Sequence, residues 1–224
     1  MSSWQDVTGT AVRAELVGFY AGFVYLRSEE DAFLRFPIER LDQAGQDRAL
    51  DWARSYIELR RNGVVLPMEA TWAKVLTDNL VQSDGEREAP FNPIASGQDP
   101  EFILLYFASE RDRDAREFSP RLASVVATTL EIGYTNFLPI YVSRDRRERD
   151  YTKTLAELGW AGVRYADREI ALLTSVEPEG IPSMVILDRR GNILLSASQD
   201  EEDGALGLLW RQFADILDMT NQNF

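Results

Sequence analysis

Cysteine and histidine are both absent from the 224 residues of this chain. Without cysteine there is no disulfide, no thiolate nucleophile and no thiolate ligand for an iron–sulfur cluster. Without histidine there is no imidazole base, no Ser-His-Asp triad and no metal site of the usual imidazole type. Carboxylates, tyrosine, serine and two lysines, Lys74 and Lys153, are what remains for chemistry. We therefore expect neither a bound metal nor a cofactor.

Positive charge and long apolar runs are also scarce. The formal net charge is −13, and because binding to a phosphate backbone requires a basic surface, nucleic acid is not an expected partner. No apolar run approaches the length of about 20 residues that a transmembrane helix needs. Met1–Val7 are polar and lack the basic and apolar segments of a secretory signal. The sequence does not give the compartment, which is the cytoplasm, or the periplasm if a leader has been removed.

The first part of the chain has the pattern of a small β domain. In "AVRAELVGFYAGFVYLR" apolar residues alternate, and Gly18 and Gly22 bracket a hairpin connection. The stretch "DAFLRFPI" predicts a third strand, which Pro37 ends or confines to a sheet edge. We expect this domain to occupy residues 1–46.

A helical pattern follows the β segment. Trp52 and Tyr56 recur at helix spacing, and Asn62-Gly63 predicts the end of the helix. We expect residues 47–69 to form a helical connector and residues 70–224 to form a second domain. Near the start of that domain, Asp84-Gly85 predicts a turn, and "EREAPFNPIASGQDP", broken by three prolines, predicts a loop.

The second domain alternates strands with helices. "EFILLYFA" and "FLPIYVS" are continuous apolar runs, which indicate strands buried on both faces. "IPSMVILD" and "NILLSAS" flank Arg190-Gly191 and predict a hairpin. Helical patterns lie over Phe118–Ile132 and Arg147–Leu158, with a final one near the carboxyl end. This order predicts an α/β fold, in which a mixed central sheet is covered by helices on both faces.

Several motifs in this domain resemble one known family. "ILLYFAS", "EFSPRL", "LPIYVSRDRRERDYTKTL" and "EGIPSMVILDRRGNIL" are similar to segments of the tryparedoxin/nucleoredoxin branch of the thioredoxin-like superfamily. The resemblance extends roughly from Lys74 to Ala197. It implies a thioredoxin-like fold, and it implies that Ile181-Pro182 is the cis-proline step of that fold. The main chain beside this proline pairs with extended substrates in active relatives.

The resemblance fails where the family has its chemistry. The family places Trp-Cys-X-X-Cys after the first buried strand, and this chain has Glu110, Arg111, Asp112, Arg113 and Asp114 there. Because dithiol–disulfide exchange needs a thiolate, we expect a redox-inactive protein. The charged turn is a solvated helix start capped by an aspartate, or a charged recognition surface. We do not expect it to bind a metal, because its spacing does not fit a calcium loop.

The amino-terminal segment resembles SLA1 homology domain 1, a small SH3-like β unit. The resemblance rests on Trp4, Thr8-Gly9, Ala14–Gly18, Val24–Arg27 and Pro37–Leu41. Together the two resemblances suggest a module that binds a protein or peptide, or that has a structural role. The alternatives are a non-redox enzyme that uses the carboxylates of the charged turn, and a scaffold subunit of a larger assembly.

Overall fold

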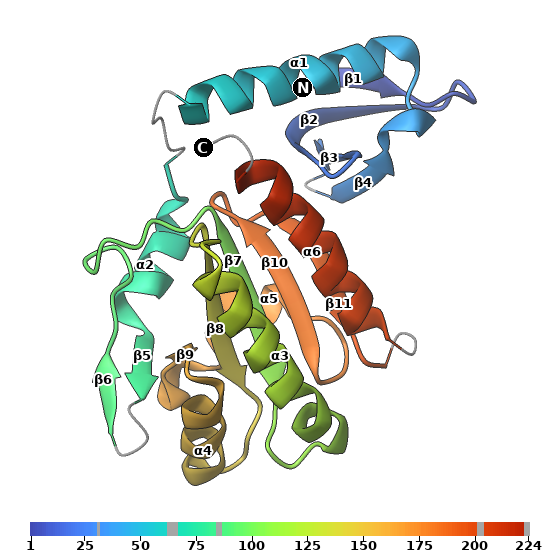
Figure 1. Ribbon diagram of the computed structural model, residues 1–224. Coiled ribbons are helices and arrows are strands. Elements are labelled where there is room, and N and C mark those ends of the chain that lie inside the picture. The colour runs from blue at the N-terminus through green and yellow to red at the C-terminus, as the bar shows by residue number, and fades with distance from the viewer. Residues whose placement is uncertain (31, 62–66, 84–86, 201–203, 222–224) are drawn as a thin grey trace. The chain divides into compact units, whose positions relative to one another are not determined.

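The computed structural model describes residues 1–30, 32–61, 67–83, 87–200 and 204–221 (Figure 1). The chain divides into two compact units, one formed by Met1–Leu66 with Gln212–Phe224 and the other by Pro67–Arg211. No described helix is both long enough and apolar enough to cross a membrane.

The first unit contains an antiparallel sheet of four strands in the order β1-β2-β3-β4. Its elements are β1 (Ser2–Gln5), β2 (Ala11–Tyr20), β3 (Phe23–Ser28), β4 (Phe33–Pro37), the 3₁₀ turn η1 (Ile38–Arg40) and α1 (Gln43–Arg61). The expected hairpin is present, since β2 and β3 pair around a turn at Ala21-Gly22. Trp4, Val24, Leu26 and other apolar side chains form the core of this unit. Asn62-Gly63 lies outside the described residues.

The second unit is built on a seven-stranded sheet in the order β11-β10-β7-β8-β9-β5-β6. Its elements are α2 (Ala70–Asp78), β5 (Leu80–Ser83), β6 (Glu88–Pro90), β7 (Phe102–Ala108), α3 (Arg113–Glu131), β8 (Phe137–Ser143), α4 (Glu148–Leu158), β9 (Ala161–Val163), η2 (Tyr165–Asp167), α5 (Ala171–Val176), β10 (Ser183–Asp188), β11 (Ile193–Ser198) and the start of α6 (Ala205–Asn221). The pairs β7–β8 and β8–β9 are parallel, whereas the other pairs are antiparallel. The mixed sheet expected from the sequence is confirmed.

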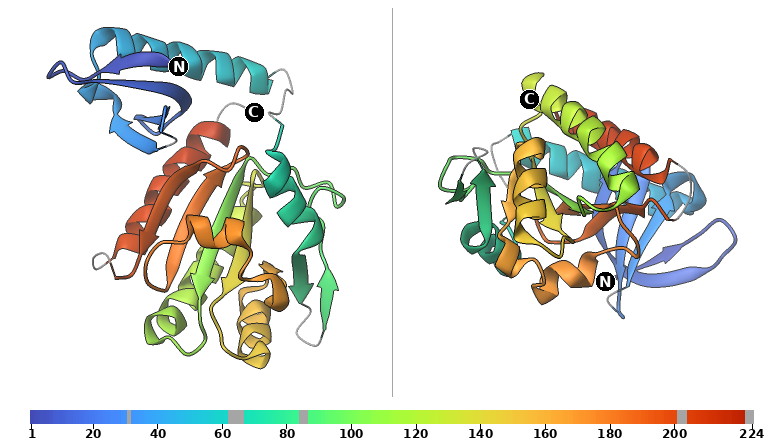
Figure 2. Two further views of the ribbon diagram at one scale, coloured as in Figure 1. Left: turned by 180° about the vertical axis from the view of Figure 1, so that it is seen from behind. Right: turned by 90° about the horizontal axis from the view of Figure 1, so that it is seen from below.

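Side chains of β7 and β8 alternate between two apolar layers, because successive residues of a strand face opposite sides of a sheet. On one face, Ile103 and Leu138 join a core with Trp72 of α2 and Leu173 of α5. On the other face, Tyr106 contacts Phe118 of α3, and Tyr141 stacks on Tyr151 of α4. Figures 1 and 2 show α3 and α4 on the opposite side of the sheet from α5. These two layers explain why β7 and β8 are apolar throughout.

Two elements differ from the sequence-based expectation. Helix α3 begins at Arg113, five residues before the expected start, because Asp112 caps it, and the helix continues through Pro120. Residues 88–90 form the short strand β6 in a segment expected to be a loop, and β6 pairs with β5 at the edge of the sheet. Proline is tolerated there because an edge strand does not need every N–H for pairing. The turn expected at Asp84-Gly85 lies outside the described residues.

Candidate functional site

The charged turn connects the end of β7 to the first turn of α3. Asp112 is the N-cap of α3, and its Oδ1 accepts a hydrogen bond from the backbone N–H of Ala115 at 2.7 Å. Asp114 is exposed in the first turn of the helix. Both carboxylates are favoured at this position, because the unpaired N–H groups at a helix N-terminus carry partial positive charge.

A buried carboxylate lies beneath the turn. Asp145 follows β8 by two residues and is 2% exposed. Its Oδ1 accepts hydrogen bonds from Ser109 Oγ at 2.8 Å and from Glu110 N at 2.9 Å. Its Oδ2 accepts from Tyr141 OH at 3.0 Å and from Ser143 Oγ at 2.9 Å. Four bonds offset the cost of removing the carboxylate from water, and they fasten the end of β7 to the end of β8.

Two charges of the turn are paired with helix α4. The Glu110 carboxylate forms an ion pair with Lys153, and it also accepts a hydrogen bond from Thr154 at 3.4 Å. Arg111 Nε donates to Asp150 Oδ2 at 3.0 Å. These contacts hold the turn against α4, so Glu110 and Arg111 are already engaged within this unit.

The same contacts affect proton binding at α4. The hydrogen bond from Arg111 lowers the pKa of Asp150, and the hydrogen bond to Glu110 raises the pKa of Lys153. In both cases the charged form is the one that is favoured. Arg113 points elsewhere: it is exposed and forms a 3.5 Å pair with Glu117 on its own helix.

The proline step lies next to the charged turn. The Ile181–Pro182 peptide bond is cis, Pro182 is buried and Ile181 is partly exposed. Strand β10 pairs with β7 through Ser183 and Phe107. Ile181 and Pro182 directly precede β10, and Ser109 and the charged turn directly follow β7, so both lie at the end of the strand pair that Ser183 and Phe107 mark. The two parts of the predicted site are therefore brought together at one end of the sheet.

The main chain of Ile181 is available for pairing. Pro182 O accepts a hydrogen bond from Gln199 N at 3.0 Å, so the proline is joined to the segment after β11. No described residue bonds the N–H or C=O of Ile181. Such free main-chain groups at the end of a sheet are what an added extended segment can bind.

A hollow of about 200 Å³ lies beside the turn. It is lined by Ser109, Glu110, Ala115, Arg116, Ser119, Pro120, Lys153, Thr154 and Glu157. Acid–base catalysis there would require a carboxyl group with a raised pKa. Burial raises the pKa of Glu101 to about 7 and also raises that of Asp188, but these groups lie at the other end of β7 and β10. Among the described residues, no cluster of acidic side chains could hold a metal ion.

The residues that anchor the turn are not among the site residues expected from the sequence. Ser109 directly follows β7, and Ser143 and Asp145 lie at the end of β8. Because the carboxyl ends of parallel strands meet at one edge of a sheet, polar residues after two such strands are expected to lie close together. That signal was present in the segments "AS" and "SRD" that end the two apolar runs.

Comparison with known proteins shows what the second unit is similar to. A family model described as "Thioredoxin-like" matches residues 99–193. Nucleoredoxin from Danio rerio is 25% identical over 126 residues, which cover 54% of this chain and 30% of that protein. Probable nucleoredoxin 3 from Oryza sativa subsp. japonica is 27% identical over 92 residues, covering 41% of this chain and 20% of that protein. The chain thus spans less than a third of the length of these two relatives.

Solved structures of similar proteins include tryparedoxins. Tryparedoxin I from Leishmania major has a TM-score of 0.48 at 20% identity, covering 65% of this chain and 94% of that one. Native tryparedoxin I from Crithidia fasciculata has a TM-score of 0.48 at 19% identity, covering 63% and 92%. The family match and the mixed sheet confirm the fold expected from the sequence. The chain therefore carries a thioredoxin-like domain related to the nucleoredoxins, and because it has no cysteine it cannot be a thiol redox enzyme.

Proposed function

We propose that the thioredoxin-like domain is a redox-inactive module that binds an extended peptide segment of a protein partner. The observation that carries this proposal is the free main chain of Ile181 beside the cis-proline. Pairing between main chains requires no sulfur, so it survives the loss of the cysteines. Free N–H and C=O groups supply affinity, and neighbouring side chains select the sequence.

The charged turn supplies the selectivity in this proposal. The side chains of Arg111 and Arg113 are 52% and 82% exposed. Arg111 follows the end of β7 by three residues and Ile181 precedes β10 by two, so both lie at the same end of this antiparallel pair. Arg111 bonds Asp150 through its Nε, and Arg113 forms only a long pair with Glu117, so both guanidinium groups keep exposed N–H groups that favour a carboxylate on a bound segment. We therefore propose that the preferred peptides are acidic.

For the first unit we propose the SH3-like fold of SLA1 homology domain 1. Its antiparallel sheet of four strands supports this proposal. With it we propose the domain boundaries that the sequence suggests, residues 1–46, 47–69 and 70–224. A second binding module in the same chain would make the protein an adaptor, which holds one partner at each module.

The test begins with peptides selected against the full chain. Linear, cysteine-free 12-mers are selected by phage display and then added to the ¹⁵N-labelled protein. We expect the Ile181 amide to exchange its hydrogen quickly in the free protein and slowly in the complex, because only the complex gives it an acceptor. N-methylation of the alternate peptide residues whose N–H groups face Ile181 should abolish binding. Alternate residues of a strand turn their N–H groups toward the same neighbour.

A matched pair of variants tests the role of the turn. Arg113→Glu should weaken binding of acidic peptides by about 3- to 10-fold, as expected for the loss of a charge at the rim of an interface. Lys74→Glu changes the charge equally on the exposed face of α2 and should leave affinity unchanged. A complex in which the Ile181 amide stays unprotected would contradict peptide pairing. Failure to select any peptide would favour a structural role instead.

A further inference from the structure

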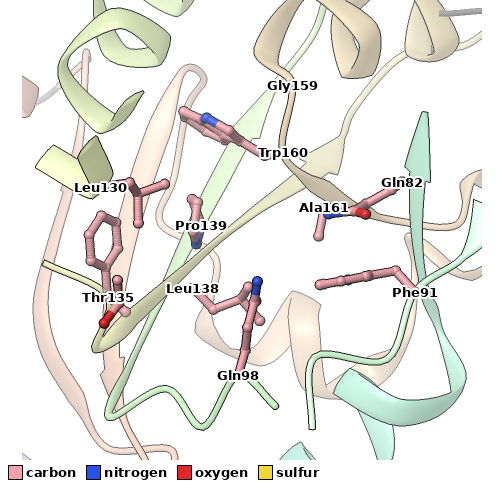
Figure 3. Close-up of a pocket in the computed structure, with 11 residues that line it drawn as sticks. Gln82, Phe91, Gln98, Leu130, Thr135, Leu138, Pro139, Gly159, Trp160 and Ala161 are labelled. Atoms are coloured by element: carbon pink, nitrogen blue, oxygen red, sulfur yellow. The ribbon is translucent and has the colours of Figure 1, made fainter. Parts of the chain in front are cut away.

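A pocket of about 210 Å³ lies beside the beginning of β8, away from the charged turn (Figure 3). Strand β9 begins at Ala161, which pairs with Ile140. In the described part of the sheet, Phe137–Pro139 therefore pair with β7 on one side and with no strand on the other. The pocket occupies the region next to this short unpaired stretch. Asp145 and the charged turn lie past the other end of β8, so the pocket is a separate site.

The inner surface of the pocket is apolar and rich in aromatic rings. Its apolar lining residues are Phe91, Leu130, Phe137, Leu138, Pro139, Trp160 and Ala161. In Figure 3 the Trp160 and Phe91 side chains enter from different sides, with Leu138 and Pro139 of β8 between them. Aromatic side chains make favourable edge-to-face and offset contacts with another ring. The lining is therefore suited to an aromatic ligand.

The opening of the pocket is polar but uncharged. Gln82, Gln98 and Thr135 are exposed lining residues. The side-chain amides of Gln82 and Gln98 form no hydrogen bond with any described residue. Each amide offers both donors and an acceptor. Of the described lining residues none is ionisable, so a charged ligand would lose hydration without gaining a compensating charge.

The volume of the pocket limits the size of the ligand that it can hold. An engineered apolar cavity of about 150 Å³ binds benzene, whereas pockets for drug-sized ligands measure about 300–1,000 Å³. The present pocket lies between these limits. We propose that it binds a small uncharged aromatic compound, a single ring with an amide-like substituent that hydrogen-bonds to Gln82 or Gln98.

Three small molecules test this proposal on the ¹⁵N-labelled full chain. Benzamide has the ring and the amide, benzoate has the ring with a negative charge, and acetamide has the amide without the ring. We expect benzamide to shift the Trp160 indole N–H and Ala161 amide signals, with a dissociation constant of about 1 mM or lower, as suits a ligand of this size. Benzoate and acetamide should bind at least about tenfold more weakly, because each lacks one of the two favourable terms.

Two exposed positions on one segment provide the matched variants. Gln98→Trp places a bulky ring at the opening and should abolish the benzamide shifts. Ala95→Trp adds the same side chain at an exposed residue that does not line the pocket, and should leave them unchanged. The proposal is overturned if benzamide leaves Trp160 and Ala161 unaffected up to 20 mM, if benzoate binds as well as benzamide, or if Gln98→Trp binds normally.

Discussion

A side chain at Gly191 would clash with a buried tryptophan ring. Gly191 lies in the turn between β10 and β11 with φ +79°, and a Cβ there would be 2.1 Å from Trp72 Nε1. Trp72 is 2% exposed, so its ring cannot move aside easily. Gly191→Ala should lower the free energy of unfolding by about 3 kcal/mol, from backbone strain together with overpacking.

Gly97 supplies the control for that measurement. Its φ is +82°, nearly the same, but a Cβ there would meet no atom within 4 Å. Gly97→Ala should therefore cost only the backbone strain of about 1 kcal/mol. Urea unfolding of both variants separates the two contributions, and equal losses would show that contact with Trp72 is unimportant.

Asp145 is the second residue with a large expected effect. Asp145→Ala leaves the donors of Ser109, Glu110, Tyr141 and Ser143 without their acceptor, so the free energy of unfolding should fall by about 2–4 kcal/mol. Asp78 is exposed and none of the described residues bonds its side chain. Asp78→Ala should change stability by less than about 0.5 kcal/mol in the same urea experiment. A similar loss in both variants would argue against the network.

At the residue scale, the sequence predicts contacts between residues close in the chain better than contacts between distant residues. An aspartate cap on the helix after the turn was predictable, because capping depends on residues three apart in the chain. The network around Asp145 joins residues 36 apart, so it can be predicted only once β7 and β8 are known to be parallel neighbours, whose polar ends then meet. Glu110 and Arg111 were expected to be solvated or free for recognition, yet they pair with Lys153 and Asp150, which are distant in sequence.

At the scale of elements, the start of α3 offers the spacing in sequence that a dithiol requires. Asp112 and Ala115 are three residues apart at the helix N-terminus, and that spacing brings two Cα atoms within the range of a disulfide. Asp112→Cys with Ala115→Cys should therefore restore insulin reduction with dithiothreitol. The helix N-terminus should also lower the pKa of the thiol at position 112 from about 8.5 toward 7, as measured from the pH dependence of alkylation.

The single variant Asp112→Cys is the control for the dithiol. It can attack a disulfide but has no second thiol to release the mixed disulfide, so turnover should stay near the level of the buffer. If the double variant is equally inactive while its fold is intact by circular dichroism, the turn has lost the geometry as well as the cysteines.

The beginning of β7 should make stability depend on pH. Burial raises the pKa of Glu101 from 4.5 to about 7, in an environment that includes Asn136, Arg189 and Asp188. The folded state then binds more protons than the unfolded state between these values, so stability is lost as pH rises from about 4.5 through 7. The loss is on the order of 3 kcal/mol, at about 1.4 kcal/mol per pH unit.

Glu101→Gln should remove this contribution. The free energy of unfolding is measured in urea at pH 5 and at pH 8. Between these two pH values it should fall by on the order of 3 kcal/mol less in the variant than in the wild type. Glu131→Gln, at an exposed residue of α3, should retain the wild-type dependence. Identical pH profiles for all three proteins would rule out Glu101 as the source.

Long elements were easier to predict than short ones. Strands β7 and β8 each contain seven buried residues, which give an unmistakable apolar run. Strands β6 and β9 contain three residues each, too few for a periodic pattern, and their pairing depends on β5 and β8. The start of α3 was misplaced because Pro120 resembled a residue of a helix's first turn, where proline is usual.

At the scale of the whole molecule, the absence of cysteine decides what activity is open to the chain. Dithiol–disulfide exchange begins with a thiolate, so the wild-type protein should accelerate insulin reduction by dithiothreitol no more than buffer does. The dithiol variant of α3 serves as the positive control in the same assay. Turnover by the wild-type chain would mean that electrons reach insulin by a route that does not involve sulfur in this protein.

The outer edge of the large sheet also affects how copies of this protein meet. Phe91 N donates to Leu80 O, so by alternation Ala89 also turns its N–H inward, whereas Glu88 and Pro90 face outward. Proline has no N–H, and β6 therefore presents one outward donor, at a residue with negative charge. Such an edge is a poor template for another strand. Crowded solutions of this protein should accordingly resist fibril growth that begins at β6.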